Sequence, residues 1–282
     1  MAQIKPVAPV DVRPLFDPLH RELLMMLRTL APEDWQRQTS APRWKVADVV
    51  AHLVDTAVRR LSNDRDRHAP VAPESPITDN ASLTAFLDEL NADWVKASRR
   101  ISPRLLVEFL DVVGRQLVDW IESADLNAPA TFAVAWAGEQ ASPAWFDIAR
   151  DYTERWHHHQ QIAEAVLAPG LNARKYLHPV IDISMRALPY AYRDVTAAPT
   201  TGVTFEVTGE AGGAWTLVRD ADAWRLFAGS LPHVAAHVRV DQETVWRMFF
   251  KQRTRDQVLT AMAVGGRTDL AHPFAGVLAV MG

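Results

Sequence analysis

The chain has 282 residues, more than one compact core usually holds, so the sequence predicts two domains. Hydrophobic residues make up 48% of the chain, but Asp48, His52 and Asp55 break the apolar stretch 46–58, so no membrane-spanning helix is expected. The net charge is −4 and no basic run alternates with aromatic residues, which argues against nucleic acid as a partner. Residues 1–11 lack the apolar centre of a signal peptide, and we expect a cytoplasmic protein.

The chain contains no cysteine. This excludes disulfides, cysteine-ligated zinc and a cysteine nucleophile within the chain. Thiol chemistry would therefore need a thiol supplied from outside.

The first part of the sequence has the periodicity of helices. Apolar residues recur every three or four positions over 11–30, 45–63, 81–101, 103–124 and 145–167. Ser102-Pro103 and Ser142-Pro143 are typical helix starts, and Pro169-Gly170 is a helix-breaking pair. Residues 63–80 are rich in Pro, Asp and Ser, which indicates a mobile surface loop. Residues 1–168 are therefore predicted to form a helical domain that contains a bundle of four antiparallel helices.

The second part of the sequence has a different pattern of apolar and turn-forming residues. Short β-like runs at 203–208, 215–218, 224–227 and 236–240 are separated by Gly- and Asp-containing turns. Helical segments are expected at 175–193, 242–250, 255–263 and 270–281. Residues 171–282 are therefore predicted to form a small α+β domain with an antiparallel sheet.

The densest group of possible metal ligands runs from Glu154 to Gln161. Glu154 and His158 lie on one face of the predicted helix, Gln161 falls in the same stripe, and His159 points to the opposite side. Two ligands four residues apart can hold one ion, and His52 on the 45–63 helix is the best-placed third ligand in a bundle. The spacing is compatible with a divalent metal site formed by His52, Glu154 and His158, although on spacing alone an ordinary solvated polar face is the more frequent case.

Less specific interpretations compete with this one. His159 shares a face with Tyr152 and Trp156 and is expected to be a core histidine, whereas one interpretation of His157 is that it is simply exposed. His52 and His158 both lie beside acidic residues, so each can also belong to an ordinary solvated face.

Trp44, Val46, Asp48 and the run 49–53, Val-Val-Ala-His-Leu, are followed about a hundred residues later by Glu154, His158 and Gln161-Ile162. This combination resembles the DinB-like superfamily of metal-binding four-helix bundles, in particular its mycothiol-dependent maleylpyruvate isomerase-like branch. In that branch a smaller sterol-carrier-like α+β domain follows the bundle, and residues 209–226 with the helices after them look like such a domain.

The resemblance implies that His52, Glu154 and His158 bind zinc, with water completing the coordination. Relatives often carry a histidine where Gln161 stands, so a contribution from that position is open, as is one from His157 or His159. Two imidazoles and one carboxylate leave an open coordination position, which is typical of reactive rather than structural sites. A metal can lower the pKa of a bound thiol, and the resemblance suggests mycothiol as that thiol.

The expected function is therefore a metal- and thiol-dependent isomerase or S-transferase acting on a small electrophile. The alternatives are a non-catalytic protein that binds metal and a small ligand, and a metal-dependent hydrolase. An anionic substrate would need arginines, for which Arg59, Arg60, Arg247 and Arg253 are candidates, although each is more often an ordinary surface residue. We assign none of them to the site. The expected partners are a small substrate and a small thiol, with the chain a monomer or weak homodimer and no membrane partner.

Overall fold

A computed structural model describes residues 4–280, which form two compact units. The helical unit comprises residues 11–132 and 142–171, and the sheet unit comprises residues 4–10, 133–141 and 172–280. The change of unit at residues 171–172 lies close to the predicted boundary. The segments 4–10 and 133–141, assigned by sequence to the first domain, belong instead to the sheet unit. Independent folding of the two parts stays a prediction.

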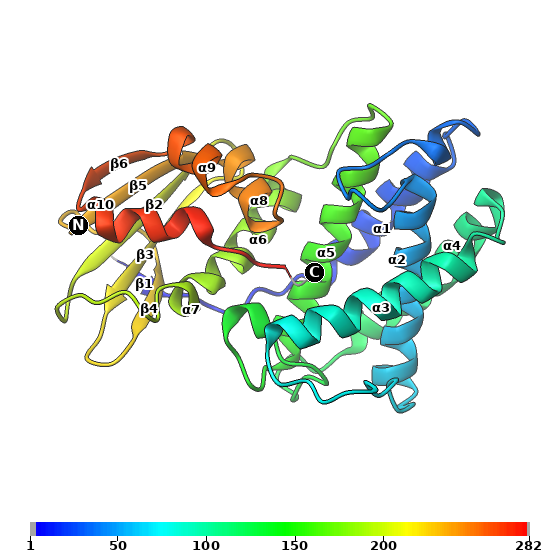
Figure 1. Cartoon of the computed structure of the whole chain (residues 1–282), viewed down its shortest axis with the longest axis horizontal. Coiled ribbons are helices and arrows are strands. Elements are labelled where there is room, and N and C mark those ends of the chain that lie inside the picture. Colours follow the sequence, from blue (N-terminus) through cyan, green and yellow to red (C-terminus); the bar gives the residue numbers. More distant parts are fainter. Residues whose placement is uncertain (1–3, 281–282) are drawn as a thin grey trace. The chain divides into compact units, whose positions relative to one another are not determined.

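The helical unit contains the helices that the periodicity predicts (Figure 1). They are α1 (Arg13–Leu27), α2 (Val46–Arg60), α3 (Asn80–Ser98), α4 (Pro103–Ser123) and α5 (Ala144–Ala165), with a 3₁₀ turn at Asp34–Gln36. A π-helical turn, Leu61–Arg65, continues α2. Residues 66–79 form no regular element and are mostly exposed. Helix α2 packs against α4, α3 and α5, and α1 packs against α4 and α5.

Local chemistry explains where these helices begin. The Ser102 hydroxyl accepts a hydrogen bond from the backbone N–H of Leu105, and Pro103 occupies the first turn of α4. At α2 the carboxylate of Asp48 accepts from the backbone N–H of Lys45. The apolar faces of α1, α2 and α4 then meet in one core, whose members include Leu23, Leu27, Val46, Val50, Leu53, Leu106, Leu110 and Ile162.

Gly114 lies in the interior of α4, where glycine normally weakens a helix. A Cβ at this position would overlap the His20 ring and lie 2.6 Å from its Nε2 and 2.7 Å from its Nδ1. His20 itself is buried on α1. The glycine therefore makes room for a buried imidazole between α1 and α4.

We expect Gly114→Ala to lower the free energy of unfolding by about 1–3 kcal/mol, as overpacked cores do. Without the His20 contact, alanine in a helix interior would instead be favourable by roughly 1 kcal/mol. Urea denaturation measures the change, and Gly276→Ala is the control because a Cβ there meets nothing within 4 Å. A double variant that also carries His20→Ala should lose less stability than the sum of the single variants. Unchanged stability in Gly114→Ala would contradict this packing.

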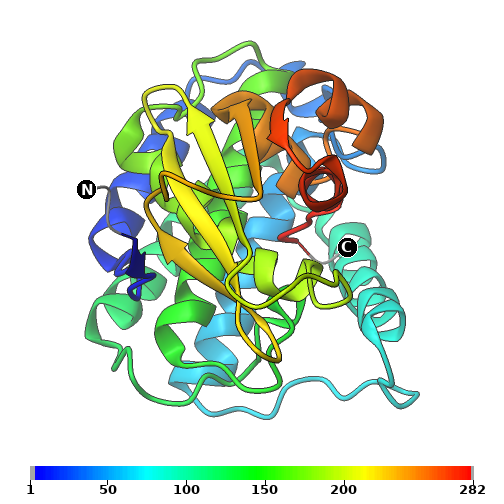
Figure 2. The ribbon, with the colours of Figure 1, turned by 90° about the vertical axis from the view of Figure 1, so that its left-hand side faces the viewer.

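The sheet unit contains a six-stranded sheet of order β1-β4-β3-β2-β5-β6 (Figure 2). The strands are β1 (Lys5–Pro6), β2 (Gly202–Thr208), β3 (Gly213–Arg219), β4 (Trp224–Ala228), β5 (Ala236–Asp241) and β6 (Ala263–Gly266). All neighbouring pairs are antiparallel except β2 and β5, which are parallel. The sheet is thus mixed, which corrects the antiparallel prediction, because the chain between β4 and β5 crosses back to the far side of β2.

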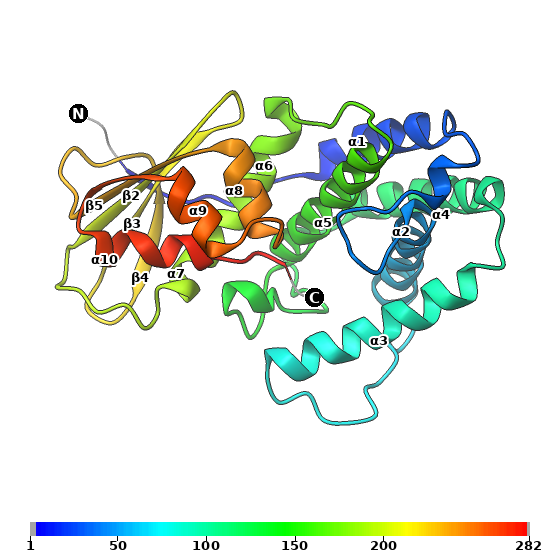
Figure 3. The same ribbon diagram turned by 45° about the horizontal axis from the view of Figure 1, so that its top comes forward.

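The helices of this unit are α6 (Arg174–Ser184), α7 (Leu188–Ala191), α8 (Gln242–Phe249), α9 (Arg255–Ala261) and α10 (Thr268–Ala271), shown from another side in Figure 3. One sheet face carries Phe205 and Trp215, which are register partners. His178 of α6 stacks on Trp215, and Tyr192 and Phe274 contact Phe205. This face therefore forms the core of the sheet unit.

Two helix predictions need correction. Residues 175–193 form α6 and α7 with a 3₁₀ turn, Met185–Ala187, between them, rather than one helix. The predicted helix 270–281 is absent as a continuous element. Instead α10 is followed by a 3₁₀ turn at His272–Gly276, because Pro273 and Gly276 disfavour α-helix, and residue 281 lies outside the described residues. Another 3₁₀ turn, Ala135–Ala137, also belongs to this unit.

Within residues 4–280 no helix is long and apolar enough to cross a membrane.

Candidate metal centre

The structure places His52 of α2 beside His158 of α5. Their ring centroids are 4.9 Å apart, and the rings meet edge to face. Both residues are buried, with 8% and 7% of their surface exposed. The solvated-face interpretation of these histidines is therefore wrong. Helices α2 and α5 bring together two imidazoles that are separated by more than a hundred residues in sequence.

Trp44 covers this histidine pair. Its ring centroid lies 4.7 Å from that of His52 and 6.2 Å from that of His158. The loop before α2 fixes Trp44, because its backbone carbonyl accepts hydrogen bonds from the Thr39 hydroxyl and the Gln38 side-chain amide at 2.7 and 2.9 Å. The indole thus shields the two imidazoles from one side.

Gln161 sets the tautomer of His158. Its Oε1 lies 2.8 Å from His158 Nδ1, and an amide oxygen only accepts, so Nδ1 carries the proton. Nε2 of the neutral ring then carries a lone pair. Orientation of a ligand histidine through its other nitrogen is a common property of metal sites. Position 161 therefore contributes to this site by orienting His158, which the sequence left open.

Both imidazoles are held neutral. Burial lowers the pKa of His158 to about 4, with the Gln161 hydrogen bond acting in the opposite direction and the Arg155 charge adding to the decrease. Burial also lowers the pKa of His52 well below its ordinary value, and His158, Arg59 and Arg155 act in the same direction. His52 Nδ1 is buried and has no hydrogen-bond partner in the described structure. Neutral, desolvated imidazoles are good donors to a divalent cation.

Glu154 is half-buried one turn before His158 on α5. It does not complete a cluster with the two histidines, since among residues 4–280 no group of three or more His, Asp or Glu side chains is arranged to hold a metal ion. The imidazole pair fits a divalent cation as two nitrogen donors. A carboxylate donor is not in place beside them, so the predicted three-ligand set stays a proposal.

The neighbouring histidines are both buried. His159 is 2% exposed, which agrees with the prediction of a core histidine, and burial lowers its pKa to about 4 against an opposing hydrogen bond from Gln160. The expectation that His157 is exposed is wrong. It is 5% exposed, and its ring stacks on that of His158 with centroids 5.5 Å apart, because neighbouring segments cover α5 on nearly every side.

The candidate arginines of the helical unit already have partners. Arg59 pairs with Asp55 and donates to Asn91, and Arg60 is buried among carboxylates. In the sheet unit Arg247 pairs with Glu243 and lies over the ring of Trp246. Neither Arg59 nor Arg60 therefore supplies an unpaired guanidinium group near the histidine pair.

Sequence reasoning missed a buried ionic cluster in the helical unit. Arg60 forms ion pairs with Asp64, Asp147 and Asp151, and Asp147 also pairs with Arg150. Burial by itself would raise the pKa of Asp147, but Arg150 and Arg60 outweigh it and hold the pKa at about 2. Asp147 and Asp151 are four residues apart on α5 and so share one helix face, which lets a single cation reach both.

Fold and site together define an α+β protein whose helical unit encloses a histidine pair. Residues 16–163, more than half of the chain, match the family model described as "Mycothiol maleylpyruvate isomerase N-terminal domain". The chain belongs to this family, which confirms the resemblance seen in the sequence.

Solved structures agree with the fold. The crystal structure of a mycothiol-dependent maleylpyruvate isomerase is similar with a TM-score of 0.51 and 10% sequence identity, over 86% of this chain and 88% of that chain. The structure of its H52A mutant gives the same values. At this identity the similarity supports the fold alone. No curated protein matches the sequence.

Proposed function

We propose that the protein is a metal- and thiol-dependent isomerase or S-transferase that acts on a small electrophilic substrate, in the manner of a maleylpyruvate isomerase. Family membership supports the class of reaction. The observation that carries the proposal is the buried pair of neutral imidazoles, His52 and His158, with Gln161 fixing the tautomer of His158.

We propose that His52, Glu154 and His158 together hold one divalent ion, with zinc as the expected metal. Glu154 lies one helical turn before His158 on the same face of α5, and this placement supports its inclusion in the proposed ligand set. When bound, such an ion supplies Lewis acidity that favours the thiolate form of a thiol at neutral pH. Two neutral imidazoles and one carboxylate leave the ion a net positive charge and an open position.

The chain's own residues prepare this chemistry. His52 and His158 stay unprotonated at neutral pH and offer nitrogen lone pairs, and Trp44 excludes water from one side of the rings. Because the chain has no cysteine, the nucleophilic sulfur must come from a small thiol, for which the family description suggests mycothiol. We further propose a cytoplasmic location, where such thiols are kept reduced.

Two other functions differ from this one in a measurable way. A non-catalytic protein would bind metal and a small ligand, the ligand in a sterol-carrier-like sheet unit, without thiol-dependent turnover. A hydrolase would turn over substrate with water in place of the thiol. Family membership favours the thiol-dependent reaction over both.

Cobalt substitution tests the role of the thiol. In the cobalt-loaded protein, adding mycothiol or a simpler thiol should produce a sulfur-to-cobalt charge-transfer absorption in the near ultraviolet. The chain has no cysteine and therefore no thiolate of its own, so a thiolate-to-cobalt band must arise from the added thiol. His158→Ala is the control and should lose the band. A fully loaded protein without any such band at saturating thiol would contradict thiol activation.

A further inference from the structure

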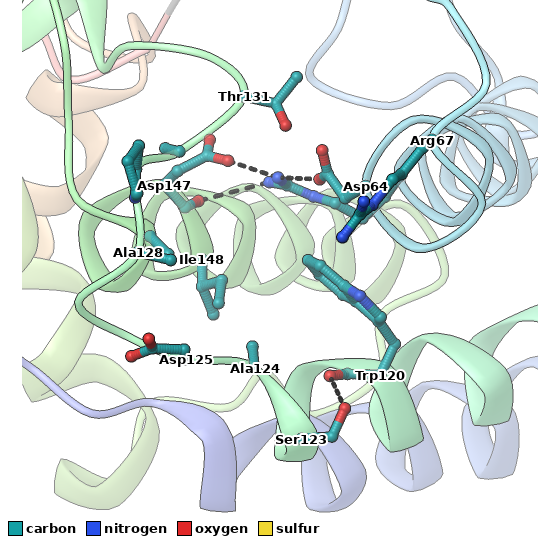
Figure 4. A pocket seen from close by; sticks show the side chains of 14 residues that line it. Asp64, Arg67, Trp120, Ser123, Ala124, Asp125, Ala128, Thr131, Asp147 and Ile148 are labelled. Carbon is teal, nitrogen blue, oxygen red and sulfur yellow. Dashed lines mark hydrogen bonds and ion pairs between the residues drawn. The ribbon is translucent and has the colours of Figure 1, made fainter.

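A second polar site lies in the helical unit, away from the histidine pair. A cavity of about 360 Å³ opens where the end of α2, the end of α4, the segment 124–131 and the start of α5 meet (Figure 4). Arg60, at its wall, follows His52 by eight residues on α2, which corresponds to roughly 12 Å along the helix axis. The volume is within the usual range of small-molecule sites, roughly 300–1,000 Å³.

Arg60, at the wall of the cavity, already has three acidic partners. Its guanidinium is engaged by Asp64, Asp147 and Asp151, and Nη2 also contacts the backbone carbonyl of Asp147 at 3.5 Å. Burial acts to lower the pKa of Arg60, but the three carboxylates outweigh it and raise the pKa. Arg60 therefore stays charged, and carboxylates of the protein itself balance its charge.

Two side chains on the α2 side of the cavity can form further hydrogen bonds or ion pairs. The Asp64 side chain is 9% exposed, and its Oδ2 binds Arg60 while its buried Oδ1 has no hydrogen-bond partner within residues 4–280. Arg67, an exposed residue, also lines the cavity, and in the described part of the chain its guanidinium forms no hydrogen bond or ion pair. Figure 4 shows the two side chains next to each other on one side of the cavity.

The backbone is built to place Arg67 there. The π-helical turn Leu61–Arg65 ends with bonds from the backbone N–H of Asp66 to the carbonyl of Leu61 and from His68 to Ser62. Between them Arg67 adopts a left-handed conformation with φ of 55°, which is uncommon for a residue other than glycine. π-Helical turns and left-handed residues are both frequent at functional sites.

The opposite side of the cavity is acidic and the middle is apolar. Asp125 lies across from Arg67 in Figure 4, and its carboxylate accepts only the backbone N–H of Asn127 within the described residues. Between the two lie the half-buried indole of Trp120, Ile148 and several alanines. Among the described residues that line the cavity, Arg67 and Asp64 Oδ1 thus lack partners at one end, and Asp125 at the other end is bonded only to the Asn127 N–H.

We propose that this cavity binds a basic α-amino acid. The α-carboxylate pairs with Arg67, the adjacent α-ammonium group donates to Asp64 Oδ1, and the aliphatic chain crosses Trp120 to bring the terminal ammonium group to Asp125. Guanidinium groups suit carboxylates because they offer two parallel donors. A simple anion would meet two carboxylates for one free arginine, and a diamine would leave Arg67 unpaired. An α-amino acid with a cationic side chain matches all three groups.

Isothermal titration of the full chain with L-lysine tests the proposal. We expect binding that Arg67→Gln and Asp125→Asn each weaken by about tenfold or more, as loss of a charged hydrogen bond does. Arg65→Gln and Glu122→Gln are matched controls, because these exposed residues do not line the cavity, and they should bind as the parent does. His158→Ala should also bind normally, which separates the cavity from metal coordination at the histidine pair.

The ligand itself supplies a second measurement that depends on no substitution. Cadaverine, which lacks the carboxylate, and norleucine, which lacks the terminal amine, should each bind about tenfold or more weakly than L-lysine. No binding of L-lysine at about 1 mM would overturn the proposal, because that limit excludes all but very weak sites. Equal binding of the three compounds would overturn it as well. Loss of binding in His158→Ala alone would move the ligand to the histidine pair.

Discussion

Replacing Arg60 by alanine is expected to lower the free energy of unfolding of the helical unit by about 3–5 kcal/mol, the usual cost of breaking a buried ion pair. The side chains of Arg60 and Asp147 are only 8% and 3% exposed, and Asp64 and Asp151 are nearly as buried. Without Arg60, Asp64 loses its partner and Asp147 keeps only Arg150. Uncompensated carboxylates inside the protein account for the loss.

Urea denaturation followed by circular dichroism measures this effect. Arg104→Ala is the matched control, because Arg104 forms an ion pair with Glu108 on α4 in which the side chains are 90% and 54% exposed. Exposed pairs of this kind contribute about 0–1 kcal/mol. Equal effects of the Arg60 and Arg104 substitutions would mean that water reaches the cluster and would contradict this account.

Acid should destabilise the metal-free protein well above the pH at which its carboxylates titrate. Burial lowers the pKa of His20 to about 4, with Arg155 adding to the decrease and Asp111 opposing it, and burial lowers that of His159 to about 4 as well. In the unfolded chain both histidines titrate near their ordinary value of about 6.5. As the pH falls from about 6.5 to 4, the unfolded chain therefore binds protons that the folded chain does not.

Above about pH 6.5, burial of the two neutral imidazoles makes its full contribution to the free energy of unfolding. As the pH falls to about 4, this contribution decreases by about 3 kcal/mol for each histidine. Below that pH the folded form binds the same protons and these two residues cause no further loss. Urea midpoints at several pH values measure the slope. His20→Gln removes one titrating group and should flatten the slope. A slope in His20→Gln identical to that of the parent would contradict the burial of a neutral His20.

Much of the helical unit was predictable because its helices carry strong local patterns. The apolar spacing of α1, α2 and α4 and the Ser102-Pro103 start are visible in the sequence and agree with the structure. The sheet was less predictable. The parallel pairing of β2 with β5 and the two-residue strand β1 depend on contacts between distant segments, which no local pattern encodes.

The site was predicted only in part for a similar reason. Helical spacing and the family resemblance selected His52 and His158, which the structure brings together. The role of Gln161 requires the rotamers of two side chains, so the sequence leaves it open. The pairing of Arg60 with Asp147 joins residues 87 positions apart, and its charges look like an ordinary polar surface when α2 and α5 are considered separately. Helix periodicity predicts on which face of a helix a residue lies, but it does not predict which residue of another helix that side chain contacts.

The central claim, that His52, Glu154 and His158 bind one divalent ion, is tested most directly by equilibrium zinc titration of the full chain and two neighbouring variants. The parent should bind one ion, and His158→Ala should weaken binding by about a hundredfold or more, since changes even beyond the direct ligands cost about 10–100-fold. His159→Ala should keep the affinity and lose thermal stability, because His159 is a core residue with 2% exposure. Normal zinc affinity in His158→Ala, or loss of zinc in His159→Ala alone, would contradict the assignment.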